Sequence, residues 1–212
     1  MQFIKINQEN WGRREHFAHY MQNNPCSFCA TVELDISRLY QKVKNEKISL
    51  YAALIYGITR VVNRHPEMRM DLDEAGEPGY YQMLYPSYTV FHQETKTFSC
   101  MWTPYHEDFT EFYRLYQQDK RDYGDCLQMQ PKTPPGPFLL NISCIPWMNF
   151  TSFQLNIQNG YDYLLPIITI GKYRPNNGQL LLPVSMQIHH AACDGYHASL
   201  FFQELQQWID TL

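Results

Sequence analysis

The sequence predicts a single domain of the α/β class. Segments that alternate apolar and polar residues, as strands do, are interleaved with longer segments that have helical spacing. A chain of 212 residues, 44% hydrophobic and 18% charged, has the size and composition of an ordinary globular domain. Since no repeat, low-complexity tract or clear linker divides the chain, we expect one domain over residues 1–212.

The first part of the chain is expected to form a short helix, a strand and a long buried helix. Asn10 can cap a helix over residues 11–21. Residues 26–36 alternate like a strand, with one apolar face made of Phe28, Ala30, Val32, Leu34 and Ile36. Residues 48–65 are too long and too evenly apolar for one strand, so we expect a buried helix that ends before Pro66.

Strands and two further helices are expected to follow. After a turn cluster at residues 71–79, strands are predicted at residues 80–85, 88–93, 97–103, 138–145, 163–173 and 180–190. Residues 106–124 have helical spacing, whereas four prolines in residues 130–137 exclude both helix and strand there. "PNNGQ", residues 175–179, is a hairpin turn signal. The last helix has an apolar face made of Leu200, Phe201, Leu205, Trp208, Ile209 and Leu212.

The charge pattern and the N-terminus exclude several classes of protein. The net charge is −4 with both signs interspersed, so no basic surface for nucleic acid is expected. Residues 1–17 lack the apolar core of a signal peptide, and no apolar run is long enough to span a bilayer. We therefore expect a soluble cytoplasmic protein with no nucleic-acid or membrane partner. The aromatic content of 15% suits a pocket for a flat apolar molecule as well as it suits a tyrosine-rich core.

The six cysteines are expected to be free thiols, because nothing in the sequence marks the chain for secretion. Cys26 and Cys29 form a C-x-x-C pair, but no second pair or nearby histidine completes a zinc site. The pair lies in a predicted strand and not at a helix N-terminus, where redox-active thiols are usually found. Neither a metal site nor a redox role is predicted.

The segment "QIHHAACDGYH", residues 187–197, is the principal candidate site. The predicted strand ends at the adjacent His189 and His190, and the predicted last helix begins at Asp194 and Gly195. In the simplest interpretation Asp194 caps the helix and both histidines are structural. A metal ion shared by the two histidines is disfavoured, because adjacent strand residues point to opposite faces. The same alternation leaves one histidine facing a cleft, where a neutral imidazole can accept a proton near pH 7.

The pattern H-H-x-x-x-D-G at a strand-to-helix junction resembles the signature of the coenzyme A-dependent acyltransferases. Among them, "HHAACDGYH" is similar to the motif of the chloramphenicol acetyltransferase family. Further blocks resemble that family in the same order along the chain: "NWGRREHF", "TVFHQET", "NISCIPW", "YDYLLPIIT" and "LLLPVS". H-H-x-x-x-D-G alone is shared with 2-oxoacid dehydrogenase cores and condensation domains, whereas the other blocks point to the chloramphenicol enzymes.

The resemblance implies a mixed-sheet two-layer sandwich that forms a homotrimer with active sites between subunits. It also implies acetyl transfer from acetyl-CoA to the 3-hydroxyl of chloramphenicol, an antibiotic-resistance reaction that needs no metal. An acyltransferase acting on another small alcohol or thiol, including a lipoyl thiol, and a non-catalytic binder are the alternatives. The chain has no room for the lipoyl and subunit-binding domains expected of a lipoyl enzyme, and the intact motif disfavours a mere binder.

The resemblance further assigns catalytic roles to His190, Ser143, Thr169, Asp194 and Arg13. His190 is implied to be the general base, held in one tautomer by a bond between its other ring nitrogen and its own backbone carbonyl. Ser143 is implied to stabilise the oxyanion, and Thr169 to act through a bound water. Arg13 and Asp194 are implied to form a buried structural pair.

The drug pocket implied by the resemblance is largely apolar. Its residues are Tyr20, Cys26, Phe28, Thr89, Phe98, Asn141, Leu155, Tyr163 and Ile167. Lys172 and Tyr173 match positions along the acetyl-CoA channel, which Ser143 also faces. His19 and Asn24 occupy positions that vary within the family, which leaves open the shape of the pocket and the binding of other hydrophobic ligands.

Overall fold

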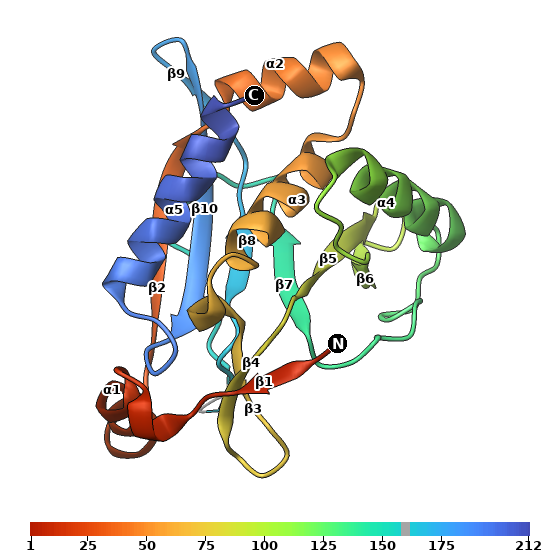
Figure 1. Cartoon of the computed structure of the whole chain (residues 1–212). Helices are drawn as coiled ribbons and strands as arrows, with labels where there is room; N and C mark the ends of the chain where they lie inside the picture. Colours follow the sequence, from red (N-terminus) through yellow and green to blue (C-terminus); the bar gives the residue numbers. More distant parts are fainter. Residues whose placement is uncertain (158–161) are drawn as a thin grey trace.

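The computed structural model describes residues 1–157 and 162–212. Its main feature is a seven-stranded sheet with the strand order β2-β10-β8-β7-β5-β6, in which β9 also pairs with β10 (Figure 1). The strands are β2 Ser27–Asp35, β5 Tyr85–His92, β6 Thr97–Trp102, β7 Leu139–Cys144, β8 Ile167–Ile170, β9 Arg174–Asn176 and β10 Gln179–His189. The pairs β5–β7 and β7–β8 are parallel and the others antiparallel, so the predicted α/β class is confirmed with a mixed sheet.

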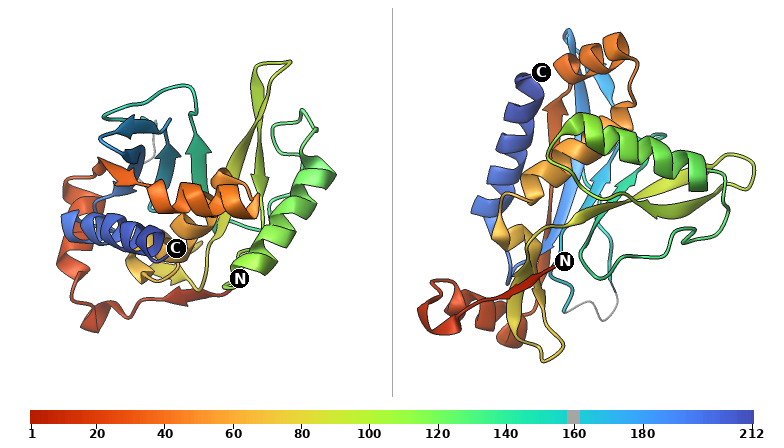
Figure 2. Two further views of the ribbon diagram at one scale, coloured as in Figure 1. Left: turned by 90° about the horizontal axis from the view of Figure 1, so that it is seen from above. Right: turned by 45° about the vertical axis from the view of Figure 1, so that its right-hand side comes forward.

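Four helices cover one face of this sheet (Figure 2). They are α2 Ser37–Glu46, α3 Leu50–Val62, α4 Phe109–Tyr123 and α5 Gly195–Asp210. The side chains of Ser49 and Asp108 accept from backbone N–H groups of the first turns of α3 and α4, which is why these helices begin there. As its evenly apolar sequence predicts, α3 is buried along nearly its whole length and ends before Pro66.

Strand alternation gives the two faces of the sheet different chemistry. On β10, Val184 and Ile188 are buried under the helices, whereas Ser185 points to the opposite face. Paired residues in neighbouring strands share a face, and Ser143, Thr169 and Ser185 are Cα partners across β7, β8 and β10. The face away from the helices, called here the open face, therefore carries a row of hydroxyl side chains.

The N-terminal prediction was wrong in detail. Asn10 does not cap a helix: it ends a short 3₁₀ turn that is capped by the side chain of Asn7. Helix α1, Arg14–Ala18, begins only after this turn and continues as one π-helical turn to Asn23. A small second sheet, not predicted as such, joins β1 Phe3–Lys5, β4 Pro78–Tyr81 and β3 Met70–Leu72.

Side chains from elsewhere in the chain break the predicted strand at residues 80–85. Arg69 donates to the carbonyls of Tyr81 and Gln82, and the amide of Asn63 bonds both the N–H and the carbonyl of Leu84. These backbone groups are then no longer free to pair in a sheet, so β4 ends at Tyr81 and β5 starts three residues after Gln82.

Of the remaining elements, the predicted hairpin turn is confirmed, one predicted strand is shorter than expected, and one helix was not predicted. The hairpin turn is confirmed, since Asn177 and Gly178 both have positive φ, as a two-residue turn between β9 and β10 requires. Of the strand predicted at residues 163–173, only β8 forms. It begins after Pro166, which has no N–H to donate to a neighbouring strand. Helix α2 was missed, since Leu39 and Val43 are its buried residues and the rest is polar.

Candidate active site

The H-H-x-x-x-D-G segment forms the turn from β10 into α5. β10 ends at His189, and Asp194 caps α5 by accepting from the backbone N–H of Tyr196. The backbone N–H of His190 donates to the carbonyl of Cys26 over 2.9 Å. Strand β2 thus fixes the position of the residue that directly follows β10.

The two adjacent histidines have different surroundings. His189 is 3% exposed, its Nδ1 accepts from the backbone N–H of Ala191, and burial lowers its pKa. His190 is half-buried. Its ring stacks on Tyr20, with centroids 3.9 Å apart, and meets the ring of Phe28 edge-on at 5.3 Å.

The two ring nitrogens of His190 also differ. Nδ1 is buried and has no hydrogen-bond partner within residues 1–157 and 162–212, so the expected bond to its own carbonyl is not present. The stack on Tyr20 sets the plane of the ring instead. Nε2 makes no hydrogen bond within the same residues and is not among their buried unpaired atoms, so it is the nitrogen available to a substrate.

Arg13 and Asp194 connect the first helix to the last. Nη1 of Arg13 lies 2.6 Å from Oδ2 of Asp194. The side chains are 18% and 33% exposed, so the pair is half-buried and not buried as expected. The reason is that Asp194 caps α5 at the surface, where the next-but-one residue, Tyr196, is 72% exposed.

Asp194 is held in its ionised form. Burial opposes ionisation, but the hydrogen bond from Arg13 and the charges of His197 and Arg13 outweigh burial and lower the pKa of Asp194 to about 2. Nδ1 of His197 lies 2.9 Å from Oδ1 and 3.2 Å from the backbone nitrogen of Asp194. Depending on its tautomer, His197 donates to the carboxylate or accepts from the N–H. Either contact restrains the short loop between His190 and α5.

A second group of predicted residues lies on the open face of the sheet. Ser143 and Thr169 are Cα partners on β7 and β8, with their hydroxyl oxygens 3.1 Å apart. Two residues earlier on each strand, Asn141 and Ile167 form the next pair on the same face. Nδ2 of Asn141 donates to the hydroxyl of Tyr163 over 2.6 Å. These side chains form one continuous surface.

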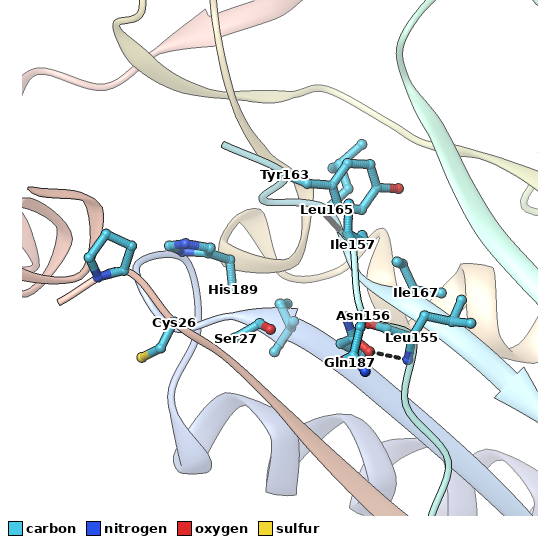
Figure 3. A pocket seen from close by; sticks show the side chains of 12 residues that line it. Cys26, Ser27, Leu155, Asn156, Ile157, Tyr163, Leu165, Ile167, Gln187 and His189 are labelled. Carbon is cyan, nitrogen blue, oxygen red and sulfur yellow. Dashed lines mark hydrogen bonds between the residues drawn. The ribbon is translucent and has the colours of Figure 1, made fainter. Parts of the chain in front are cut away.

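A pocket of about 250 Å³ lies beside this surface, between β10 and the irregular segment at residues 155–157 (Figure 3). The predicted substrate residues that line it are Cys26, Leu155, Tyr163 and Ile167. The other lining residues are Pro25, Ser27, Asn156, Ile157, Leu165, Gln187, Ile188 and His189. The pocket therefore joins the C-terminal half of β10 to part of the predicted drug site.

The other predicted binding residues lie elsewhere. Thr89 and Phe98 belong to β5 and β6, on the far side of β7, and do not line this pocket. Lys172 is exposed beyond the end of β8, and Tyr173 packs against Tyr40 with ring centroids 5.3 Å apart. One chain thus divides the predicted binding residues among several places.

His19 and Asn24, the two positions expected to vary within the family, help to hold Tyr20 in place. The ring of His19 meets Tyr20 edge-on at 4.8 Å, and the carbonyl of His19 accepts from the backbone N–H of Asn24 over 2.9 Å. Both residues therefore shape the π-helical turn that presents Tyr20 to His190.

His190 and Ser143 of one chain are well separated. Ser143 pairs with Thr169, and Thr169 pairs with Ser185, so Ser143 and Ser185 lie at the same position along the strands. His190 follows Ser185 by five residues. From ordinary strand dimensions, the two Cα atoms are about 16 Å apart along the strands and about 10 Å apart across them. One chain cannot place both side chains beside a single reacting carbonyl.

Comparison with known proteins decides the family. The family described as "Chloramphenicol acetyltransferase" matches residues 1–206. A protein of Campylobacter coli with the same description is 47% identical over 210 residues, which are 99% of this chain and 100% of that protein. The chain belongs to the chloramphenicol acetyltransferase family. The protein is therefore an acyltransferase, as the sequence predicted.

Solved structures agree with this assignment. A chloramphenicol acetyltransferase structure matches with a TM-score of 0.84 at 26% identity, covering 98% of this chain and 100% of that chain. The cubic core of the pyruvate dehydrogenase multienzyme complex matches with a TM-score of 0.61 at 15% identity, covering 91% of this chain and 85% of that chain. The second likeness shows a shared fold alone.

Two further observations concern the described part of this chloramphenicol acetyltransferase family member. No helix in residues 1–157 and 162–212 is long and apolar enough to cross a bilayer. In those residues, no three His, Cys, Asp or Glu side chains are grouped as metal ligands would be.

Sequence reasoning missed several residues that line the pocket of this family member. Gln187 and His189 come from the open face of β10, and Ser27 is the Cα partner of His189 on β2. Strand alternation could have identified Gln187, which lies two residues before His189 and therefore on the same face. Ser27 could not be found in this way, because its neighbour on β10 depends on the register between two distant strands.

Proposed function

We propose that the protein transfers the acetyl group of acetyl-CoA to the 3-hydroxyl of chloramphenicol and so inactivates the antibiotic in the cytoplasm. In this proposal the whole chain, residues 1–212, is one catalytic domain. Family membership supports the donor and the acceptor. The observation that carries the proposal is that His190 is packed against Tyr20 and Phe28, two residues of the expected drug pocket, while its Nε2 makes no hydrogen bond within residues 1–157 and 162–212.

In the proposed reaction both substrates are bound together. Nε2 of His190 accepts the proton of the 3-hydroxyl while the hydroxyl oxygen attacks the carbonyl carbon of the thioester. A carbon–oxygen bond forms and the carbonyl oxygen becomes an oxyanion. When this tetrahedral intermediate collapses, the carbon–sulfur bond breaks and the imidazolium returns its proton to the thiolate of coenzyme A.

Ser143 is proposed to donate a hydrogen bond to the oxyanion, the position at which negative charge develops. Thr169 lies 3.1 Å from the Ser143 hydroxyl and is buried, so it restrains that hydroxyl. We further propose that Thr169 holds a water as a second donor. Both residues act on the transition state, so their loss should lower the rate more than the affinity.

The remaining predicted residues are proposed to position the loop and to bind the substrates. Arg13 and Asp194 fix the loop that follows His190 through their 2.6 Å contact. Lys172 carries an exposed ammonium group two residues past the end of β8, the strand that holds Thr169, and such a group suits a phosphate of acetyl-CoA. Tyr173 is proposed to line the same channel.

We propose that the active form is a homotrimer with each site between two subunits. A reacting carbonyl must lie about 3 Å from both the oxyanion donor and the attacking group that the base activates. The separation of His190 from Ser143 within one chain supports a site shared between subunits. In a cyclic trimer, His190 of one subunit can face Ser143 of the next at three equivalent interfaces.

A coenzyme A thiol-release assay tests the proposed reaction. With acetyl-CoA and chloramphenicol, we expect thiol release that depends on both, and a product with one acetyl group on the 3-oxygen by mass spectrometry. Chloramphenicol lacking the 3-hydroxyl is the matched control and should give no release above background. Release that is absent with chloramphenicol but present with another small alcohol or thiol would assign a different acceptor.

A further inference from the structure

We propose that Gln187 is a positioning residue for the acceptor substrate, because its side-chain amide holds the Leu155 wall of the pocket in place. The inference rests on the proposed function, which makes this pocket an acceptor site. Gln187 lies on the open face of β10 and lines the pocket together with Leu155 (Figure 3). Nothing in the mechanism above uses its amide.

The amide of Gln187 makes the two hydrogen bonds that a paired strand would make. The backbone N–H of Leu155 donates to Oε1 over 2.7 Å, and Nε2 donates to the carbonyl of Leu155 over 2.7 Å. The backbone of Gln187 is itself fixed between two strands, with Ile167 and Cys29 as its Cα partners. The side chain therefore connects the segment to a rigid part of the sheet.

Phe153 is held in the same manner. Its carbonyl accepts from Oγ of Ser185 over 2.6 Å and from Sγ of Cys29 over 2.8 Å. Ser185 and Gln187 are two residues apart on β10, as Phe153 and Leu155 are in the segment. The segment thus lies on the open face with side chains, and not another strand, as its hydrogen-bond partners.

Apolar burial secures the beginning of this segment but not its end. Phe150 is buried, with its ring centroid 5.5 Å from that of Phe153. Leu155 and Ile157 are 45% and 43% exposed, so packing within the chain restrains them weakly. The two amide hydrogen bonds are the direct restraint on Leu155, which lies in the same pocket as Ile167. Losing them should widen or reshape the acceptor site.

Gln206 provides a matched control for this restraint. Its amide makes the same two bonds to the backbone of Asp35, with Oε1 2.9 Å from the nitrogen and Nε2 3.0 Å from the carbonyl oxygen. Asp35 is at the other end of β2 from Ser27, which lines the pocket. Replacing Gln206 removes a similar clamp without touching the acceptor site.

The kinetic test compares Gln187→Met with Gln206→Met in the full-length protein. We expect Gln187→Met to raise the KM for chloramphenicol about tenfold, a factor within reach of two ordinary hydrogen bonds. The KM for acetyl-CoA should stay within about twofold of the wild-type value, because acetyl-CoA is not bound by this wall. Gln206→Met should change neither KM. Equal effects of the two variants on the chloramphenicol KM, or an equal rise of both KM values in Gln187→Met, would overturn the inference.

Amide hydrogen exchange separates this inference from the proposed function, because it needs no substrate. The Leu155 amide should exchange faster in Gln187→Met than in the wild type, and at the wild-type rate in Gln206→Met. Unchanged exchange at Leu155 would overturn the clamp even in an active enzyme. If the wild type did not acetylate chloramphenicol, the proposed function would fail, whereas faster exchange would still support the clamp.

Discussion

The imidazole of His190 lies flat on the phenol ring of Tyr20, with centroids 3.9 Å apart and ring planes 6° from parallel. Because Nδ1 of His190 has no hydrogen-bond partner within residues 1–157 and 162–212, this stack is the main restraint on the plane of the ring. The π-helical turn after α1 therefore helps to orient a histidine near the C-terminus.

The stack predicts that Tyr20→Phe and Tyr20→Ala behave differently. Tyr20→Phe keeps the aromatic surface and should retain kcat/KM for chloramphenicol within about twofold, whereas Tyr20→Ala should lose about three- to tenfold, the usual worth of an aromatic pair. Steady-state kinetics with both substrates measures this. Equal losses in the two variants would show that the hydroxyl of Tyr20 matters and the stack does not.

Ser143→Ala should lower kcat by about 10²–10³-fold with small changes in both KM values, because the hydroxyl is proposed to act on the oxyanion. Ser99→Ala is a suitable control: Ser99 is a fully buried strand serine that bonds Nε2 of His92 on the neighbouring strand. It should cost stability and leave kcat near the wild-type value. If Ser143→Ala raised the KM for chloramphenicol and left kcat unchanged, the oxyanion role would be wrong.

The Asp194 carboxylate should make the free energy of unfolding depend on pH in the acid range. Its folded-state pKa of about 2 lies below its ordinary value of 3.8, so its contribution is complete above about pH 4 and is lost as the pH falls towards 2. Asp194→Asn keeps an oxygen for the helix cap but has no charge, and should cost about 1–3 kcal/mol at pH 7. Urea unfolding at pH 7, 4 and 2.5 tests this, because the difference between the two proteins should shrink at the lowest pH. If the difference in unfolding free energy did not change with pH, the charge of Asp194 would not be what stabilises the protein.

No acetyl-cysteine intermediate is expected. Cys193 is fully buried, and burial raises its pKa, so its thiol is neither accessible nor activated. Cys26 lines the pocket, so it is the cysteine to test first. Protein mixed with acetyl-CoA alone should show no stable acetyl adduct by mass spectrometry, kinetics should be sequential, and Cys26→Ser should keep most of its activity. Parallel double-reciprocal lines together with an adduct on Cys26 would point to a covalent route.

Local sequence signals predicted the parts of the fold that depend on local physics. The hairpin at Asn177 and Gly178 and the cap of α5 at Asp194 are set by a few neighbouring residues. Helix α2 was missed because its buried side chains, Leu39 and Val43, are too few to give a clear pattern. The break between β4 and β5 could not be predicted, because distant side chains take the backbone hydrogen bonds there.

The candidate site likewise has some features that the sequence predicts and others that depend on how distant strands pair. The motif places His190 after a strand and Asp194 at a helix start, and both follow from the sequence pattern. The pairing of Ser143 with Thr169 depends on the register of two parallel strands, which alternation alone does not supply. The distance between His190 and Ser143 depends on strand order, so the sequence pattern alone could not supply the separation that supports the proposed site between subunits.

Subunit complementation tests most directly the claim that His190 and Ser143 act from different subunits. His190→Ala and Ser143→Ala homotrimers should each lose most of their activity, by about 10²–10⁴-fold and about 10²–10³-fold respectively. When the two proteins are coexpressed in equal amounts, three of every four trimers are mixed, and each mixed trimer has one of three sites with both residues intact. Activity should then recover to about a quarter of the wild-type value. Activity no greater than that of the separately made homotrimers combined would place both residues in one subunit and contradict the account.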